Sequence, residues 1–588
     1  MSSANKYYVH GVNGPVISVR GGNSLPMMSL VYVGNDKIPG EVVSASGDTT
    51  IVQIYEDSAG LSKGQPVFPT GHPMSVLLGP GMLSNIYDGI ARPLRTIAAM
   101  AGDFITKGIT LPALDTEKLW DVTIELQDGD EVFPGKIFAH CKETEAIRHR
   151  CMVPPGVHGK VIDCCPSGQY NVLHEIAKIE DETGKITPLT LSQYWPIRRS
   201  RPTAKRLAIT RPLITGQRVI DTLFPVGKGG CAAIPGPFGA GKTMVQHQLA
   251  KWSDADIIVY LGCGERGNEM TQVLDEFAEL RDPKTGRPLM ERTILIANTS
   301  NMPVAAREAS IYTGMTIAEY YRDMGYHVAL MADSTSRWAE ALREISGRLE
   351  EMPAEESFPA YLPSRLAGFY ERAGYMQTLS GNEGSVTVIG AVSPQGGDFS
   401  EPVTQNTKRF IRCFWALDRS LAYARHFPAI NWTSSYSEYF ADFKDWYETN
   451  FGPGFTEMRQ RVIDILGLES SLMEIVKLIG ADVLPDDQKL IIETAKVLRQ
   501  GYLQQNAFHK TDTYMPPALQ MTMLRVILHL YDQAKALTEK SIPLNQLSAT
   551  GIFSVMDRMK FDLGEGKTEE HFLQLIDDAI SSVLAKNA

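Results

Sequence analysis

The sequence predicts a multidomain α/β protein with an N-terminal β-barrel, a β-rich insertion, a central α/β domain with a mostly parallel sheet, and a C-terminal helical bundle. The chain has 588 residues, of which 43% are hydrophobic, enough for several packed cores. Short apolar runs of strand length recur through most of the chain. Beyond Pro453 the apolar residues instead recur at steps of three and four, as they do in helices.

Changes in these patterns set the predicted domain boundaries. Short strand-like runs separated by turns, such as residues 16–19, 30–33 and 50–55, indicate a small barrel near the N-terminus. A second β-rich piece begins with a strand at 120–124, and we interpret it as an insertion into the α/β domain. The predicted domains are 1–76 for the barrel, 77–114 and 191–450 for the α/β domain, 115–190 for the insertion, and 451–588 for the helical bundle.

Composition indicates a cytoplasmic protein. The formal net charge is −11, from 68 acidic and 57 basic residues, so we expect no broad basic surface for nucleic acid. The seven cysteines include no C-x-x-C pair, and the His and Cys residues between 140 and 165 match no zinc spacing, which favours free thiols. Neither a run of about 18 apolar residues nor a signal-peptide core occurs. These observations are compatible with a protein that docks on a membrane complex.

A phosphate-binding loop follows the predicted strand at 231–234. Its glycines allow successive backbone N–H groups to converge on phosphate oxygens, and a helix beginning near Gly241 adds its positive end. Lys242 would reach the β- and γ-phosphates, and the Thr243 hydroxyl suits Mg²⁺. The loop consists of Gly236, Pro237, Phe238, Gly239, Ala240, Gly241, Lys242 and Thr243.

The next predicted strand, 257–261, runs into a second glycine-rich loop that starts at Gly262. This loop has the spacing G-x-G-x-x-G of dinucleotide sites, but Glu265 would face the pyrophosphate, and the strand at 294–296 leads to no acid for the ribose. We therefore interpret Glu265 as the group that polarises a water attacking a γ-phosphate, with Arg266 steadying the developing charge. The alternative is an exposed salt bridge in a turn.

An apolar strand at 327–333 ends in Asp333, the position expected for a second Mg²⁺ element, with the metal bound through water. Ligands of open α/β sheets lie outside the carboxyl ends of the strands. The sequence therefore predicts one nucleotide site at the ends of these three strands.

The three motifs together closely resemble the catalytic A subunit of V-type and archaeal-type rotary ATPases. They read Gly-Pro-Phe-Gly-Ala-Gly-Lys-Thr from Gly236, Gly-Cys-Gly-Glu-Arg-Gly-Asn-Glu from Gly262, and Ala-Asp-Ser-Thr-Ser-Arg-Trp from Ala332. The resemblance covers essentially the whole chain, including residues 193–198 and 224–230. The insertion is similar to the one that separates A subunits from F-type β subunits. Ala240 replaces a cysteine of eukaryotic members, which favours a bacterial or archaeal source.

The resemblance implies a RecA-like central domain in a hexamer that alternates with a non-catalytic B subunit. It also implies a central rotor shaft, a peripheral stalk and a membrane sector that moves protons or sodium ions, with this chain on the cytoplasmic side, peripheral to the membrane. By the same resemblance Lys242 and Thr243 bind phosphate and Mg²⁺, Glu265 orients water, and Arg266 and Asp333 complete the site. An arginine would arrive from the neighbouring subunit.

Two further predictions rest on the resemblance. Phe427 and Phe508 match the aromatic residues that hold adenine, and the alternative is that both belong to the core. The acidic loop with Asp482, Asp486 and Asp487 resembles the segment that touches the rotor, and the alternative is capping of the next helix.

The leading hypothesis is ATP hydrolysis or synthesis coupled to proton or sodium transport, with in-line attack by water. A ring translocase for protein or RNA is the first alternative, and the insertion, the acidic balance and the rotor-like loop argue against it. A non-catalytic ring subunit is the second, and the presence of both Lys242 and Glu265 argues against it.

Overall fold

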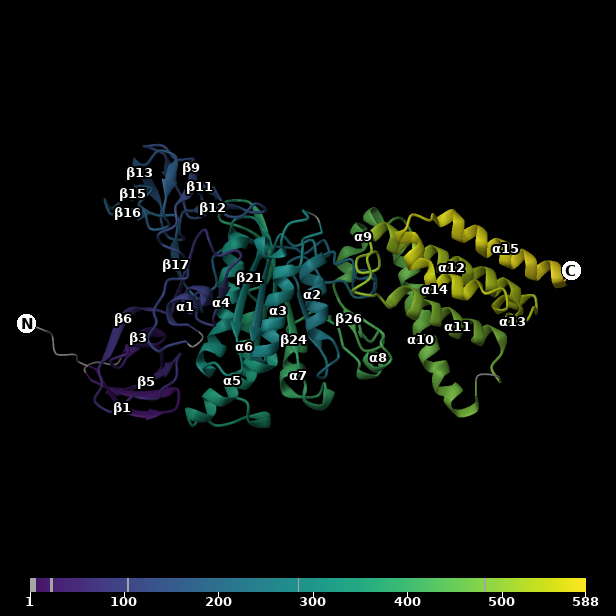
Figure 1. The fold of residues 1–588 in the computed structure, drawn as a ribbon, viewed down its shortest axis with the longest axis horizontal. Helices are drawn as coiled ribbons and strands as arrows, with labels where there is room; N and C mark the ends of the chain where they lie inside the picture. Colours follow the sequence, from purple (N-terminus) through teal and green to yellow (C-terminus); the bar gives the residue numbers. More distant parts are fainter. Residues whose placement is uncertain (1–6, 22–24, 103–104, 284, 481–482, 588) are drawn as a thin grey trace, which may run out of the picture. The chain divides into compact units, whose positions relative to one another are not determined.

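The computed structural model describes residues 7–21, 25–102, 105–283, 285–480 and 483–587 (Figure 1). The chain divides into two compact units. The first comprises residues 1–208, 228–233 and 255–411, and the second comprises 209–227, 234–254 and 412–588. Strand β19 (Cys231–Pro235) contributes its first three residues to the first unit and its last two to the second.

The first unit begins with an antiparallel barrel of six strands in the order β1-β2-β5-β4-β3-β6. Hydrogen bonds from Val9 N to Gln65 O and from Val67 N to Tyr7 O close it. Its interior is filled by Val, Ile and Leu side chains from alternate strand positions. The predicted strands at 16–19, 30–33 and 50–55 are thereby confirmed. The strands are β1 (Tyr8–Asn13), β2 (Val16–Arg20), β3 (Ser29–Val33), β4 (Ile38–Ser46), β5 (Thr49–Ile54) and β6 (Val67–Pro73).

A β-rich segment between residues 120 and 189 forms two four-stranded sheets. One has the order β12-β11-β9-β14, and the other β10-β13-β15-β16. The chain enters it after α1 (Leu94–Ala101) and leaves through β17 (Gln193–Pro196), which pairs with the earlier strand β7 (Ser75–Leu78). The strands are β9 (Trp120–Ile124), β10 (Glu131–Val132), β11 (Ile137–Lys142), β12 (Arg148–Met152), β13 (Gly159–Cys164), β14 (Gly168–Tyr170), β15 (Ala177–Glu180) and β16 (Ile186–Leu189).

A parallel sheet forms the core of the first unit, as the sequence predicts. Its strands run β24-β22-β20-β21-β8, and neighbouring pairs are parallel. Almost every strand residue is buried, which is the pattern of a sheet covered on both faces. The strands are β8 (Ile86–Tyr87), β20 (Ile257–Cys263), β21 (Thr293–Asn298), β22 (His327–Asp333) and β24 (Glu383–Val392). Helices α3 (Gly267–Glu279), α4 (Val304–Asp323) and α5 (Thr335–Arg348) follow β20, β21 and β22.

Helix α4 is buried on nearly every side, because the sheet covers one face and α5, α6 (Leu362–Tyr370) and the β-rich parts cover the rest. Arg198 bridges Glu308 of α4 and Glu41 of the barrel, with its Nη2 at 2.6 and 2.8 Å from their carboxylate oxygens. In the insertion, His149 Nε2 lies 3.0 Å from the Tyr320 hydroxyl of α4. A buried ion-pair network thus attaches the barrel to α4, and a buried hydrogen bond attaches the insertion to the same helix.

The second unit contains the helical C-terminal region, in agreement with the predicted periodicity. Met521, Leu524 and Leu528 all lie on the buried side of α12. Within the described ranges, none of the helices combines the length and apolar character needed to cross a bilayer. The main helices are α10 (Phe455–Ile479), α11 (Asp486–Val497), α12 (Pro517–Glu539), α13 (Leu544–Ser548), α14 (Ile552–Gly564) and α15 (Glu569–Asn587).

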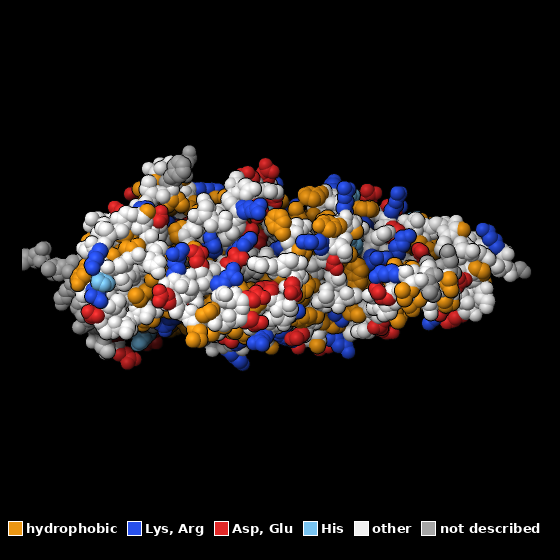
Figure 2. All heavy atoms as spheres, turned by 90° about the horizontal axis from the view of Figure 1, so that it is seen from below, with side chains coloured by type: hydrophobic (Ala, Val, Ile, Leu, Met, Phe, Trp, Pro, Cys, Tyr) orange, Lys and Arg blue, Asp and Glu red, His pale blue; other side chains and the backbone are white. Residues whose placement is uncertain are grey.

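Figure 2 shows one face of the described residues with acidic and basic side chains interspersed. This face therefore carries no field of a single sign.

We expect the substitution Arg198→Met to lower the free energy of unfolding by about 3–5 kcal/mol, because it leaves two buried carboxylates without a counter-charge. Urea unfolding followed by tryptophan fluorescence measures the loss. Arg199→Met is the matched control, since Arg199 is the exposed neighbour. Equal stability of the two variants would contradict this role of Arg198.

Candidate functional site

The phosphate-loop motif lies in the second unit, between β19 and α2 (Lys242–Trp252). Gly239 and Gly241 have φ values of +79° and +93°, a region that favours glycine. At Gly236 an added Cβ would lie 2.7 Å from the Leu417 side chain. Lys242 begins the helix, as predicted, and its Nζ donates to the carbonyls of Gly236 and Pro237 at 2.8 and 3.0 Å. The ammonium group thus lies directly over the loop.

A narrow apolar cavity of about 30 Å³ adjoins this loop within the second unit. Its walls include Ala240, Gly241, Phe427, Gln505 and Ala507. Phe427 is 40% exposed beside this cavity, so its ring offers a face on which a flat ring can stack.

Phe508 is 86% exposed and is outside the lining of this cavity. Neither Phe427 nor Phe508 is therefore a core side chain, which removes the alternative considered from sequence. The Phe508 amide donates to the Asn506 side chain at 2.9 Å, so the backbone at this position is held although the ring is not buried.

The carboxylates lie in the first unit, at the carboxyl ends of two neighbouring parallel strands. Gly262 of β20 pairs with Asp333 of β22, so the loop carrying Glu265 and the carboxylate of Asp333 emerge at the same edge. The Tyr260 hydroxyl donates to Asp333 Oδ2 at 3.2 Å. The loop is fixed by hydrogen bonds from Ser300 N to Glu265 O and from Gly264 N to Asn298 O. Arg266 is exposed at the start of α3.

Burial raises the pKa of Glu265 to about 7, and the charge of Asp333 and a hydrogen bond with Glu269 add to the shift. Arg337, in α5, opposes it. A carboxyl group with a pKa in this range exchanges a proton readily near neutral pH. Burial beside Asp333 and Glu269 thus gives Glu265 a pKa in the range that suits a general base.

Two of the residues that shift the pKa of Glu265, Glu269 and Arg337, were missed by sequence reasoning. A signal existed for each. Glu269 follows Glu265 by four residues and lies in the first turn of α3. Arg337 follows Asp333 by four residues and lies in the first turn of α5, within the third motif. Its guanidinium also pairs with Glu340 at 2.9 and 3.0 Å.

The acidic loop lies in the second unit, before α11. Asp486 and Asp487 occupy the first turn of that helix, where negative charge is favourable. Asp486 Oδ2 accepts a hydrogen bond from Leu544 N at 3.1 Å. Asp482 is outside the described residues.

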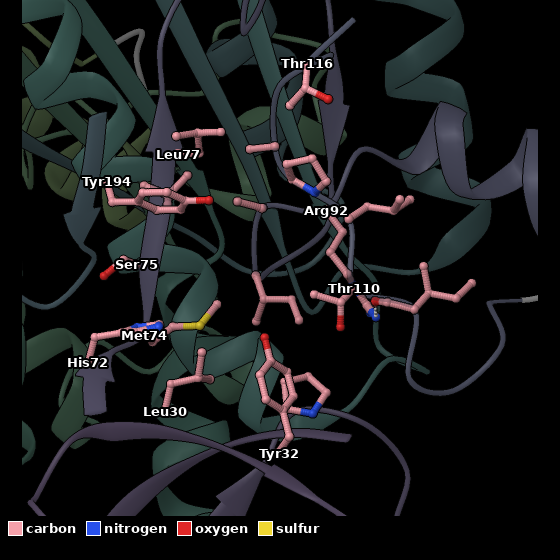
Figure 3. Close-up of a pocket in the computed structure, with 18 of the residues that line it drawn as sticks. Leu30, Tyr32, His72, Met74, Ser75, Leu77, Arg92, Thr110, Thr116 and Tyr194 are labelled. Atoms are coloured by element: carbon pink, nitrogen blue, oxygen red, sulfur yellow. Dashed lines mark hydrogen bonds between the residues drawn. The ribbon is translucent and has the colours of Figure 1, made fainter. Parts of the chain in front are cut away.

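A cavity of about 780 Å³ lies elsewhere, and its lining includes none of the predicted site residues. It lies in the first unit, beside the barrel and residues 109–113. Figure 3 shows Tyr32 and Tyr194 pointing into it from two sides. The charged and glycine-rich motifs, which carry the groups capable of phosphate chemistry, are not part of this cavity.

The sequence matches four family descriptions along its length. Residues 216–437 match "ATP synthase alpha/beta family, nucleotide-binding domain", and residues 444–547 match "C-terminal domain of V and A type ATP synthase". Residues 9–71 match the "beta-barrel domain" of the same family, and 111–198 its "barrel-sandwich domain".

Similar proteins of known name cover nearly the full length. The chain is 57% identical to the V-type ATP synthase alpha chain of Halothermothrix orenii over 560 residues, which is 95% of each chain. It is 54% identical to the A subunit of the A-type ATP synthase of Methanopyrus kandleri, over 98% of this chain and 100% of the other. The assembled ATPase EscN of the enteropathogenic E. coli type III secretion system has a similar fold. That structure gives a TM-score of 0.64 at 20% identity, covering 89% of this chain and 100% of EscN.

We expect the Glu265 carboxyl to titrate with a midpoint of about 7. Glu269→Gln should lower the midpoint, because it removes an interaction that favours the protonated form, and Arg337→Gln should raise it, because it removes a positive charge. Carbon-13 NMR of glutamate-labelled protein measures the titration, with Glu265→Gln identifying the signal. A midpoint near 4.5 in the unsubstituted chain would contradict the burial of this group.

Proposed function

The chain belongs to the V-type and A-type ATP synthase alpha (A) subunits of the ATP synthase alpha/beta family, and from this premise we propose that Lys242, Glu265, Arg266 and Asp333 are its catalytic residues in a rotary ATPase. The observation that carries the proposal is the half-buried Glu265 carboxylate at the end of β20, whose pKa is raised to about 7. The alternative considered from sequence, an exposed salt bridge in a turn, would not require the carboxylate to be buried.

The proposed reaction is in-line attack of water on the γ-phosphorus of ATP. Glu265 accepts the proton of the attacking water, the new P–O bond forms, and the bond to the bridging oxygen of ADP breaks. Backbone N–H groups of residues 236–243 and the Lys242 ammonium hold the phosphates. Arg266, joined by Arg337, stabilises the charge that develops on the transferred group. Synthesis is the same path reversed.

Mg²⁺ is the metal that the donor types fit. The Thr243 hydroxyl and the Asp333 carboxylate are hard oxygen donors, which Mg²⁺ prefers together with phosphate oxygens and water. The Tyr260 hydroxyl orients Asp333 through its Oδ2. When bound, Mg²⁺ neutralises phosphate charge. We assign Thr243 as a direct ligand and Asp333 as a ligand through water.

Adenine would stack on Phe427 at the mouth of the narrow cavity, with Phe508 covering it from the adjoining loop. Phe427 lies 3.7 Å from the position of a Cβ on Gly241, so a base on this ring adjoins the phosphate loop. Stacking of this kind discriminates little among purines.

The assembly we propose is a hexamer in which this chain alternates with a non-catalytic B subunit. The hexamer is joined to a rotor shaft, a peripheral stalk and a membrane sector that moves H⁺ or Na⁺. The first turn of α11, with Asp486 and Asp487, is the proposed rotor contact. Full-length similarity to V-type and A-type subunits supports this over the translocase alternative, since the likeness to EscN is one of fold alone.

Glu265→Gln should lower the ATPase rate by about 10²–10⁴-fold, because the amide cannot accept a proton. MgATP binding should be unchanged. In the unsubstituted protein, kcat/KM should fall as the pH drops through about 7, where the carboxylate becomes protonated. Glu279→Gln, an exposed change at the end of α3, is the control. Near-normal hydrolysis by Glu265→Gln would refute its role.

Mg²⁺-ATPase activity of the chain alone and after mixing with its B subunit tests the assembly, with particle size measured alongside. We expect weak activity alone and a steep rise as the hexamer forms, since a trans arginine contributes about 10³–10⁵ in rate in related reactions. Full activity as a monomer would favour the translocase alternative. No activity in any assembly would favour a non-catalytic role.

A further inference from the structure

We propose that Arg218, Asp512 and Lys560, here called the cap cluster, are positioning residues that hold the base-facing segment 505–507 in place for nucleotide binding. This inference rests on the proposed function, because it assumes that a base stacks beside Phe427. All these residues belong to the second unit.

The cap cluster is a set of buried charges. Arg218 and Asp512 are 0% exposed and Lys560 is 6% exposed. Arg218 Nη1 lies 2.7 Å from Asp512 Oδ1, with the geometry of an ion pair rather than a hydrogen bond, and Lys560 Nζ lies 4.0 Å from Asp512 Oδ2. Two cations thus face one carboxylate. Buried charge is costly without further partners, so other groups must balance the second cation.

Those partners are the carbonyl groups at the end of a helix. The π-helical turn η6 (Leu498–Leu503) continues α11, and its C-terminal end carries partial negative charge. Lys560 Nζ donates to Gln500 O and Gln504 O, both at 2.8 Å. Arg218 Nη2 donates to Gln504 O at 2.8 Å, and Arg218 Nε donates to Tyr502 O. The two cations therefore cap this helix end.

The chain passes directly from this capped end into the wall of the base cavity. Gln505 N donates to Phe427 O at 2.8 Å, and Gln505 Oε1 accepts from Arg218 N at 2.9 Å. The backbone N–H of Asn506 donates a hydrogen bond to Asp512 Oδ2 at 2.7 Å. The cap cluster thus holds residues 504–506, and Gln505 joins them to Phe427. Hydrogen bonds to charged groups are about twice as strong as neutral ones, which makes this a firm attachment.

A comparison of ligands with and without a base separates positioning of the base-facing segment from an effect on the stability of the whole fold. Tripolyphosphate offers phosphates to residues 236–243 but nothing to Phe427, whereas ATP engages both. We expect Lys560→Gln to raise the dissociation constant of ATP about tenfold, a loss of the size expected for charged hydrogen bonds. The dissociation constant of tripolyphosphate should stay unchanged. Calorimetric titration of the full chain with each ligand, in the presence of Mg²⁺, measures the two dissociation constants.

Matched variants control the result. Arg558→Gln, on the exposed side of α14, should change neither constant, and Lys560→Arg should restore ATP affinity because it keeps the charge and the donors. Thermal unfolding checks that each variant is folded. If Lys560→Gln does not fold, Asp512→Asn, which keeps the shape but removes the carboxylate charge, should give the same selective loss.

Equal weakening of ATP and tripolyphosphate, or no change in either, would overturn the positioning role and leave the proposed function intact. Failure of the unsubstituted chain to bind either ligand would overturn both.

Discussion

Partial burial of the Glu265 carboxylate is the constraint on which the proposed chemistry depends. In water a glutamate is ionised and a weak base, whereas removal from solvent beside Asp333 and Glu269 raises its pKa to about 7. That burial follows from the sheet. Parallel pairing of β20 with β22 brings Asp333 to the same edge, and backbone hydrogen bonds from Gly264 N to Asn298 O and from Ser300 N to Glu265 O hold the loop that carries Glu265. A change in strand register would therefore remove the base along with the fold.

Buried charges elsewhere serve attachment rather than catalysis. Arg198 joins the barrel to α4 through two carboxylates, and Arg218 and Lys560 cap η6 through carbonyls. In each case the partners are distant in sequence, so the charges are satisfied only in the folded arrangement. Such groups add little net stability, but an arrangement that separates them leaves a charge unpaired. They consequently select one arrangement of each unit.

The sequence predicted those parts of the site that depend on local structure. Lys242 begins α2 and Asp333 ends β22 because strand, loop and helix signals lie within a few residues of each other. The contribution of Arg337 depends on how α5 packs beside the loop of Glu265, which periodicity does not specify. The cap cluster was missed for the same reason, since nearly 300 residues separate Arg218 from Asp512. Phe508 was matched by its motif to an aromatic residue that holds adenine, yet its ring is not part of the lining of the cavity beside the phosphate loop.

The cap cluster lies at one end of a helical rod whose other end carries Asp486. Helix α11 has 12 residues, which is about 18 Å of α-helix, and η6 adds six residues to it. A ligand shifts a conformational equilibrium only through contacts that differ between the states. Adenine is common to ATP and ADP, so the base at the capped end cannot report which of them is bound. In the proposed mechanism that difference comes from the γ-phosphate, through Lys242 and Glu265. We infer that the base-facing segment is the end of this helical segment that keeps its place when ATP is replaced by ADP.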